Sequence, residues 1–456
     1  MIPVYAKELL EGLWPAVPED LQVTCVVTDS RLVVPGCVFV AIKGERADGH
    51  NFAAQAMQNG AVAVVAQRPL DGVPTCRTVL VRDPLDAMVA MGGNYRRKFR
   101  PLVLGVTGSV GKTTTKEFCA AVFSAFGNTL KTEGNQNNEI GMPNTLFRLT
   151  DSTQYAVIEM GMQGLGEIHK LSAAAAPNGA VITKIGVSHL ESLGSVENIL
   201  RAKMEICDGM APGAPLVLNG DDPLLQTAKV PGGIQEVFAG VQNEDCTVRA
   251  RGIETSGAGQ NFEIVDKQFG SFAAFIPALG THNIYNALFA YTAATRLGLE
   301  PTHVAQALAG YRAAGMRQNI VEVNGVTLIE DYYNASPESM RAALSLLADM
   351  QVKGRRIAVL GDMKELGEIT RQAHIELGEA CAHAKADILF TVGELAGLAV
   401  PQAQKSGVET YTFESNAKAA QRLAAIVQKG DAVLLKASRS MKFEEIAEEF
   451  KQACQC

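Results

Sequence analysis

A glycine-rich loop constrains the fold more than any other feature of the sequence. The segment from Gly105 to Thr115 reads GVTGSVGKTTT, and it lies between an apolar run at 102–106 and a segment at 115–126 with apolar residues at helical spacing. A strand, a glycine loop and a helix in this order form a P-loop, whose backbone N–H groups and helix N-terminus bind phosphate oxygens. The segment therefore predicts a nucleoside triphosphate site within an α/β sheet.

The residues of this loop have distinct expected contacts. Lys112 is expected to reach the β- and γ-phosphates, and the Thr113 hydroxyl is expected to ligate magnesium. The strict pattern has a further glycine five residues before Gly111, where this chain has Val106. An ordinary Gly/Ser turn with a surface lysine is the alternative, and the flanking strand and helix argue against it. The remaining predicted nucleotide-binding residues of the loop are Gly108, Ser109, Gly111 and Thr114.

Length and composition bound the class of protein. The chain has 456 residues, of which 47% are hydrophobic and 20% are charged, as in a globular protein of about three domains. The net charge of −7 leaves no basic excess for nucleic-acid phosphates, so nucleic acid is not an expected partner. No segment reaches about 18 uninterrupted apolar residues, and the N-terminus lacks a basic region before an apolar stretch. We therefore expect a cytoplasmic protein without a membrane span.

The cysteines predict the same compartment. There are nine of them, an odd number without C-x-x-C spacing, and most lie in apolar segments. We expect them to be reduced, buried thiols of a cytosolic protein. Cys454 and Cys456 could form a metal or redox pair, but a frayed chain end is the favoured interpretation.

Alternating strands and helices predict three α/β units. We expect a small N-terminal α/β domain at 1–99, a central P-loop domain with a mostly parallel sheet at 100–313, and a Rossmann-like, doubly wound domain at 314–456. Within the central unit, polar–apolar alternation at 246–276 predicts a β-rich meander attached to the sheet. Strands are expected at 37–42, 61–65, 78–81, 102–106, 155–159, 180–185, 215–218, 327–329, 357–360, 388–392 and 432–435. Helices are expected at 51–58, 85–98, 115–126, 282–297, 337–350, 372–384, 416–427 and 441–453.

Polar residues that follow apolar runs are candidates for the site, because ligands bind outside the carboxyl ends of strands in such sheets. Glu159 ends one run and could hold the magnesium that Thr113 contacts, although a carboxylate at a strand end is often only solvated. His189 follows another run, and an isolated histidine is more often a hydrogen-bonded loop residue than a ligand. An amide-rich loop could hold polar substrate atoms or be an ordinary turn; its candidates are Asn135, Asn137 and Asn138.

Several collinear motifs resemble one known family. The segments TGSVGKTTT, TEGNQNNEIGMP, VIEMG, HLESLGS with AKMEI, and GTHNIYNA are similar, in that order, to the Mur ligases that build bacterial peptidoglycan precursors. The missing glycine at Val106 is typical of that family. TDSR at 28–31 resembles the N-terminal domain that the D-alanyl-D-alanine-adding members share with the amino-acid-adding enzyme of the preceding step. DYYNASPESM at 331–340 and VLGDMKELG at 359–367 resemble the members that add D-alanyl-D-alanine, and the D-N-P-R motif of the preceding enzyme is absent.

The resemblance implies an activity and a metal site. The implied reaction is ATP-dependent ligation of D-alanyl-D-alanine to UDP-N-acetylmuramoyl tripeptide through an acyl phosphate, with Lys112, His189 and Lys203 as catalytic residues. Thr113 and Glu159 would hold one magnesium ion, and His189 with a carbamylated Lys203 would hold or orient a second. A plain Lys203, paired with Glu205 or a substrate carboxylate, is the alternative.

The resemblance also implies substrate contacts. Asn283 and Asn286 would lie on the adenine side, and Arg317 and Asp331 would contact the phosphates and the ribose, with closure of the third domain over ATP. Asp29, Ser30 and Arg31 would bind the uridine nucleotide, or form only a surface turn. The candidates for the peptide end are Asn334, Ser336 and Lys436. We expect a monomer. The rival interpretations are a ligase of the folylpolyglutamate synthetase type, which lacks the uridine-nucleotide domain, and a catalytically silent nucleotide-binding scaffold.

Overall fold

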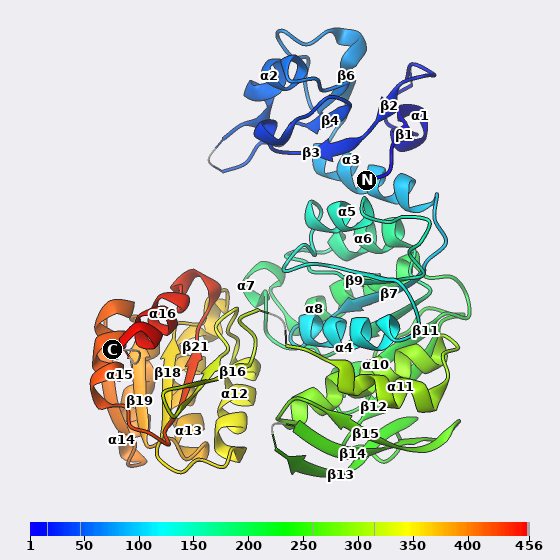
Figure 1. Ribbon diagram of the computed structural model, residues 1–456. Coiled ribbons are helices and arrows are strands. Elements are labelled where there is room, and N and C mark those ends of the chain that lie inside the picture. The colour runs from blue at the N-terminus through cyan, green and yellow to red at the C-terminus, as the bar shows by residue number, and fades with distance from the viewer. Residues whose placement is uncertain (16, 46, 258, 314, 454–456) are drawn as a thin grey trace.

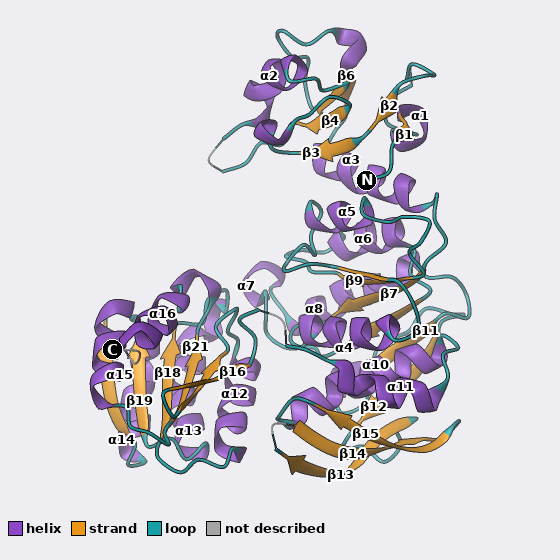
Figure 2. Cartoon of the chain, in the orientation of Figure 1, coloured by secondary structure: helices purple, strands orange, loops and turns teal. Residues whose placement is uncertain are grey.

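Three layered α/β regions follow one another along the chain. The computed structural model describes residues 1–15, 17–45, 47–257, 259–313 and 315–453. Figure 1 shows the N-terminal region in blue above the central region, with the C-terminal region in orange and red to one side. Each region has helices packed around strands, as Figure 2 shows. In the described part of the chain, no helix combines the length and the apolar character needed to cross a bilayer.

The N-terminal region contains a small parallel sheet of four strands. Its order is β3 (Cys25–Val27), β4 (Cys37–Val40), β5 (Ala63–Ala66) and β6 (Thr78–Leu80). A two-stranded antiparallel ribbon of β1 (Val4–Tyr5) and β2 (Gln22–Val23) precedes it. The helices are α1 (Ala6–Leu9), α2 (Ala53–Gln58) and α3 (Pro84–Arg96).

Helix α3 joins the N-terminal region to the central one. Asp83 caps its first turn by accepting a hydrogen bond from the backbone N of Leu85 at 2.8 Å, and Pro84 occupies the first helical position, where no N–H donor is needed. The buried Tyr95 hydroxyl donates to the carbonyl of Leu149 at 2.9 Å. Because α3 packs against α1 and against central-region helices, apolar side chains of both regions form one continuous core.

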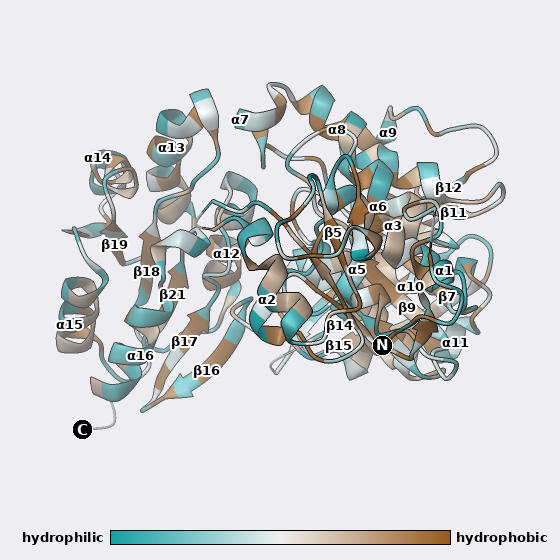
Figure 3. Cartoon of the chain, turned by 90° about the horizontal axis from the view of Figure 1, so that it is seen from above, coloured by the Kyte–Doolittle hydropathy of each residue, from teal (hydrophilic) through white to brown (hydrophobic). Residues whose placement is uncertain are grey.

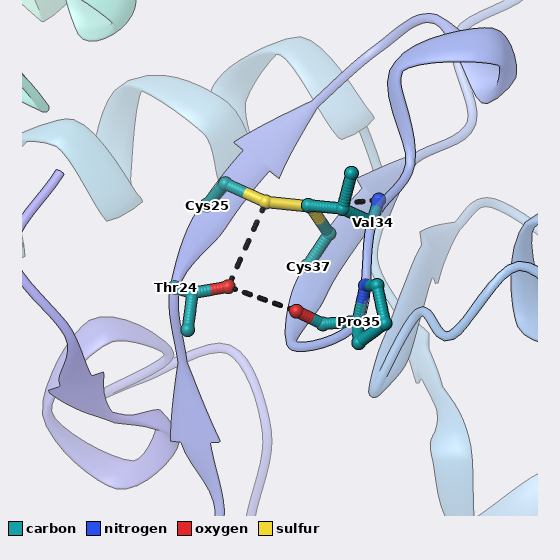
Figure 4. Close-up of a disulfide and its surroundings, with 5 residues drawn as sticks. All are labelled: Thr24, Cys25, Val34, Pro35 and Cys37. Atoms are coloured by element: carbon teal, nitrogen blue, oxygen red, sulfur yellow. Dashed lines mark hydrogen bonds between the residues drawn. A yellow bond between two sulfur atoms is a disulfide. The ribbon is translucent and has the colours of Figure 1, made fainter.

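A disulfide joins Cys25 to Cys37, so the prediction of reduced cysteines is wrong for this pair (Figure 4). The two residues are register partners on the parallel strands β3 and β4, and their Cα atoms are 4.6 Å apart. Thr24 lies beside the bond and donates to the carbonyl of Pro35 at 3.2 Å. Strand register places the thiols together, and a spacing of 12 residues in the chain does not reveal register. Cys454 and Cys456 lie outside the described residues.

We expect reduction of this disulfide to destabilise the N-terminal region. A cross-link that closes a loop of this length restricts the unfolded chain, and its loss is expected to lower the free energy of unfolding by about 3 kcal/mol. Urea denaturation with and without dithiothreitol measures the difference. The double variant Cys25→Ser, Cys37→Ser should unfold identically in both conditions, whereas a Cys76→Ser variant, which removes an exposed free thiol, should keep the wild-type response. A wild-type protein indifferent to dithiothreitol would contradict the assignment.

The central region is built on a nine-stranded sheet, which confirms the predicted parallel sheet with its attached meander. The sheet order is β15-β14-β13-β12-β11-β10-β7-β9-β8, parallel from β13 to β8 and antiparallel at β13–β15. The strands are β7 (Leu102–Thr107), β8 (Thr129–Lys131), β9 (Tyr155–Glu159), β10 (Gly179–Ile182), β11 (Pro215–Asn219), β12 (Gln235–Gly240), β13 (Val248–Ser256), β14 (Gly259–Asp266) and β15 (Gly270–Ile276). The sequence interpretation did not include β8 and β12.

Helices cover both faces of this sheet. They are α4 (Lys112–Ser124), α5 (Gly141–Leu146), α6 (Glu167–Ala175), α7 (Leu190–Leu193), α8 (Val196–Met204), α9 (Pro223–Gln226), α10 (Thr281–Arg296) and α11 (Pro301–Ala307). Strand side chains alternate between two cores: Val103 and Ile158 face the core shared with α3, and Leu104 faces the core formed with α4 and α10. Figure 3 shows these strands as apolar segments. Burial on both faces explains their continuous apolar sequence.

The C-terminal region is a six-stranded, doubly wound sheet, as predicted. Its order is β16-β17-β21-β18-β19-β20, parallel except for β16. The strands are β16 (Asn319–Val323), β17 (Val326–Glu330), β18 (Arg356–Gly361), β19 (Ile388–Val392), β20 (Glu409–Phe413) and β21 (Ala432–Lys436). One face is covered by α12 (Pro337–Asp349), α13 (Thr370–His383) and α14 (Val400–Lys405), and the other by α15 (Asn416–Ile426) and α16 (Glu444–Ala453).

Candidate active site

A cavity of about 1100 Å³ lies where the carboxyl ends of strands from two sheets meet. Glu159 is the last residue of β9, Lys436 is the last residue of β21, and Asp331 directly follows β17. All three line the cavity together with the P-loop. Ligand sites of open α/β sheets form at this edge, so the cavity is the candidate active site.

The P-loop has the conformation that phosphate binding requires. Gly108 has a φ of +147° and Gly111 a φ of +86°, and a Cβ at position 108 would overlap the Thr183 hydroxyl. Only glycine fits both constraints. Helix α4 begins at Lys112, so the free N–H groups of its first turn lie at the loop. Lys112 Nζ donates to the carbonyls of Gly108 at 2.8 Å and Ser109 at 3.4 Å. Val106 is a buried strand residue, so no glycine is needed there.

Glu159 and Thr113 present adjacent oxygens to the cavity. The Thr113 hydroxyl donates to Oε2 of Glu159 at 2.9 Å, and Asn137 Nδ2 donates to Oε1 at 2.8 Å. Only 1% of Glu159 is exposed, and Lys116 Nζ lies 3.7 Å from its Oε2. A buried carboxylate with a cation behind it and a hydroxyl beside it supplies the oxygen donors that a hard divalent cation prefers.

The amide-rich loop lines the cavity and also forms a turn. Asn135, Asn137 and Asn138 all line the cavity. Asn137 contacts Glu159, whereas Asn138 Oδ1 accepts hydrogen bonds from the backbone N of Ile140 at 3.2 Å and of Gly141 at 2.9 Å. Asn138 therefore also organises the turn before α5, as the alternative interpretation expects, and Asn135 is exposed.

Three basic side chains near the P-loop, those of Lys112, His189 and Lys203, influence one another's pKa values. Burial and then the charges of Lys112 and Lys203 lower the pKa of His189 to about 4, so its imidazole is neutral at neutral pH. Burial also lowers the pKa of Lys112, which nearby Glu159 partly offsets. His189 Nδ1 lies 3.2 Å from Oε2 of Glu365, which belongs to the C-terminal region. The electrostatic environment therefore favours an anionic ligand.

Lys203 lies behind the cavity rather than on its surface. It is on α8, only 1% of it is exposed, and it is not among the residues that line the cavity. Burial and then the charge of Lys112 lower its pKa well below the ordinary value. The Glu205 carboxylate accepts from the backbone N of Gly166 and His169 instead. Across the described residues, Lys203 has no ion pair, so the structure lacks the alternative Lys203–Glu205 pair.

The asparagines on α10 belong to a polar network. Asn286 lines the cavity and accepts a hydrogen bond from the Thr115 hydroxyl at 2.9 Å. Asn283 lies behind it, accepts from Asn286 Nδ2 at 3.2 Å, and donates to Gln318 Oε1 at 2.9 Å. The sequence analysis did not predict Gln318 as a residue of this network. Its position next to Arg317 in the sequence was the signal that could have identified it.

The C-terminal region brings residues from two predicted subsites together. Lys436 Nζ donates to Asp331 Oδ2 at 2.7 Å and to the carbonyl of Asn334 at 3.2 Å. Ser336 caps α12 by accepting from the backbone N of Ser339 at 3.3 Å. Arg317 lines the same cavity with these residues. A second cavity of about 380 Å³ is lined by Asn334, Ser336, Glu365 and Arg439, and it adjoins His189.

The structure does not bring the predicted uridine-end residues into either of these cavities. Asp29 caps the short 3₁₀ helix at Ser30–Leu32 and accepts hydrogen bonds from the backbone N and side chain of Arg31. The Arg31 guanidinium and this hydrogen bonding hold the pKa of Asp29 at about 2. Ser30 is buried.

Three segments of the chain match profiles of one family. Residues 22–83 match the profile described as Mur ligase family, catalytic domain, residues 106–294 match the Mur ligase middle domain, and residues 316–439 match the Mur ligase, glutamate ligase domain. The UDP-N-acetylmuramoyl-tripeptide--D-alanyl-D-alanine ligase of Bacillus subtilis (strain 168) is 39% identical over 439 residues, which cover 94% of each chain. The chain belongs to the Mur ligase family.

Solved Mur ligase structures are similar over nearly the whole chain. MurF from Acinetobacter baumannii has a TM-score of 0.89 and 31% identity, covering 99% of each chain. The MurF ligase from Thermotoga maritima, solved in complex with ADP, has a TM-score of 0.84 and 31% identity, covering 96% of this chain and 99% of that one. The family and the three-part architecture expected from the sequence are confirmed.

Proposed function

We propose that this Mur ligase joins D-alanyl-D-alanine to UDP-N-acetylmuramoyl tripeptide and converts ATP to ADP and phosphate. The product is the UDP-N-acetylmuramoyl pentapeptide precursor of peptidoglycan. The observation that carries the proposal is the cavity in which Lys112 of the P-loop and Arg317 and Asp331 of the C-terminal segment line one space. The names of the Bacillus subtilis and Acinetobacter baumannii relatives support the choice of substrates.

Magnesium fits part of the site directly. Thr113 and Glu159 would hold one ion, since their oxygens are adjacent and both line the cavity. When bound, magnesium would neutralise phosphate charge during transfer. His189 and an unmodified Lys203 offer nitrogen, which magnesium disfavours. A second ion therefore requires the carbamate of Lys203, which would supply oxygen. The lowered pKa of Lys203 favours this modification, because the neutral amine is the form that reacts with carbon dioxide.

The chain's own residues account for the chemistry. The tripeptide carboxylate attacks the γ-phosphorus of ATP, the bond to the β,γ-bridging oxygen breaks and ADP leaves, and Lys112 offsets the repulsion between the two anions. The amine of the dipeptide then attacks the acyl carbon of the resulting acyl phosphate. Inorganic phosphate leaves, the nitrogen loses a proton, and the amide bond is formed. Asn283 and Asn286 lie on the adenine side of the bound nucleotide, and Asp331 contacts its ribose. The smaller cavity beside Asn334 and Ser336 has room for the dipeptide next to His189.

We assign the binding of the three substrates to three domains. Residues 1–99 bind the uridine-linked acceptor through Asp29, Ser30 and Arg31, residues 100–313 bind ATP, and residues 314–456 close over it and bind the dipeptide. Closure would exclude water from the acyl phosphate. The same proposal places the protein in the cytoplasm, which the composition and the lack of a long apolar segment in the sequence support, and describes it as a monomer.

Two rival functions are less well supported. A ligase of the folylpolyglutamate synthetase type does not explain the N-terminal sheet or the family match at residues 22–83. A silent scaffold does not explain the joint placement of Lys112, Glu159 and His189 around one cavity.

The test is phosphate release by the purified full chain with ATP and magnesium. Release should require both D-alanyl-D-alanine and a UDP-N-acetylmuramoyl tripeptide, and tripeptides ending in diaminopimelate and in lysine are both supplied. Mass spectrometry should detect the pentapeptide product. Equal release with either substrate omitted would reject the proposed ligase activity.

A further inference from the structure

The Arg317 guanidinium has an unusual environment. Its Cζ lies 4.0 Å from the centroid of the Tyr333 ring, a cation–π contact. Both side chains line the large cavity. Within the described ranges, Arg317 has neither a hydrogen bond nor an ion pair, so the donors of its guanidinium remain available to a ligand.

The residues on both sides of Arg317 are held by hydrogen bonds. The carbonyl of Met316 accepts a hydrogen bond from the backbone N of Tyr333 at 3.2 Å. The carboxamide oxygen of Gln318 lies 2.8 Å from Nε2 of His282 and accepts from Asn283 at 2.9 Å. Residues 316–318 connect the central and C-terminal sheets, and these contacts tie the connection to both of them.

The charge of Arg317 favours an anionic ligand. Arg317 and the P-loop residue Lys112 both line the large cavity, so their charges act on the same space. Two cations that line one cavity favour a polyanionic ligand between them. A guanidinium stacked on a ring keeps its N–H edge free for phosphate oxygens, whereas an unsupported arginine must lose rotamer freedom on binding.

We propose that Tyr333 is a positioning residue that presents Arg317 to the phosphates of the nucleotide. The inference rests on the proposed function for the identity of the ligand as an adenine nucleotide. Tyr333 does not belong to the hydrophobic cores, which contain its neighbour Tyr332 instead. Among the described residues its hydroxyl has no hydrogen bond, so the ring face is the part of the side chain that acts.

The experiment is calorimetric titration of the full chain with magnesium ADP. Tyr333→Leu should weaken ADP binding by roughly three- to tenfold, the range of a partly exposed cation–π contact. Tyr333→Phe should bind ADP as the wild type does, since it keeps the ring. Tyr411→Leu is the matched control, because Tyr411 stacks on Arg422 at 4.8 Å in the same region, away from the cavity, and ADP affinity should not change.

A double-mutant cycle decides whether Tyr333 acts through Arg317. Arg317→Ala should weaken ADP binding, and adding Tyr333→Leu should cause no further loss. Additive losses would mean that the ring contacts the nucleotide itself and would overturn the proposal. Normal ADP affinity of Arg317→Ala, or failure of Tyr333→Phe to match the wild type, would overturn it as well. ADP binding needs neither the acceptor nor the dipeptide, so a failed ligase assignment would be seen separately in the two-substrate assay.

Discussion

Replacement of Lys112 by alanine is expected to reduce substrate-dependent phosphate release roughly a thousandfold, as loss of a charge at the transferred phosphoryl group does elsewhere. The side chain lines the cavity at the start of α4, where its ammonium can follow the charge that develops on the phosphates. Its only polar partners among the described residues are the P-loop carbonyls of Gly108 and Ser109. The fold should therefore survive.

The measurement is single-turnover phosphate release at saturating ATP, with thermal unfolding to verify the fold. Lys405→Ala removes an exposed lysine at the end of α14 and serves as the control, with unchanged release. A Lys112→Ala protein that retains more than about a tenth of the wild-type rate would contradict a direct role at the phosphates.

Glu159→Gln is expected to abolish high-affinity binding of a divalent cation and to lower phosphate release by at least about a hundredfold. Glutamine keeps the shape and the hydrogen bond from Thr113, but it removes the negative charge that attracts the ion. Lys116 remains 3.2 Å from Glu117 Oε1, so it keeps one counter-charge and the domain should stay folded. Electron paramagnetic resonance with Mn²⁺ as the probe measures the binding directly.

A second carboxylate on the cavity wall provides the control for the Glu159→Gln variant. Glu139 also lines the cavity, but it pairs with Lys170 at 3.1 Å rather than with Thr113. Glu139→Gln should therefore bind Mn²⁺ as the wild type does. Equal Mn²⁺ affinity of Glu159→Gln and the wild type would remove Glu159 from the proposed metal site.

Much of the site could be predicted because its chemistry is encoded locally. The P-loop needs glycine at positions of positive φ, and Gly108 and Gly111 satisfy that need within one short segment. Glu159 could be placed because a parallel sheet puts all its carboxyl ends at one edge. Asp331 and Lys436 were candidates only through the family resemblance, which gave no sign that they form an ion pair.

Other features depend on contacts between distant segments. The Cys25–Cys37 bond follows from strand register. The Glu205 carboxylate accepts hydrogen bonds from residues 166 and 169, which leaves Lys203 without one of the two partners that the alternative interpretation named. Nothing in the sequence distinguishes Lys116 from an exposed helix residue, yet its side chain is buried beside Glu159. The motif at 359–367 gave no role for Glu365, which the fold places beside His189.

The sequence by itself determined the chemistry of this protein: a P-loop, a carboxylate after a neighbouring strand, and motifs of the Mur ligase family in collinear order. Glycine conformation, strand periodicity and helix capping are properties of short segments, so they can be read along the chain. Only the tertiary structure decided which charges meet. It put Arg317 on the ring of Tyr333, left Lys203 buried, and joined Lys436 to Asp331. Burial and Coulomb interactions depend on distance in space, and the chain order does not contain that distance.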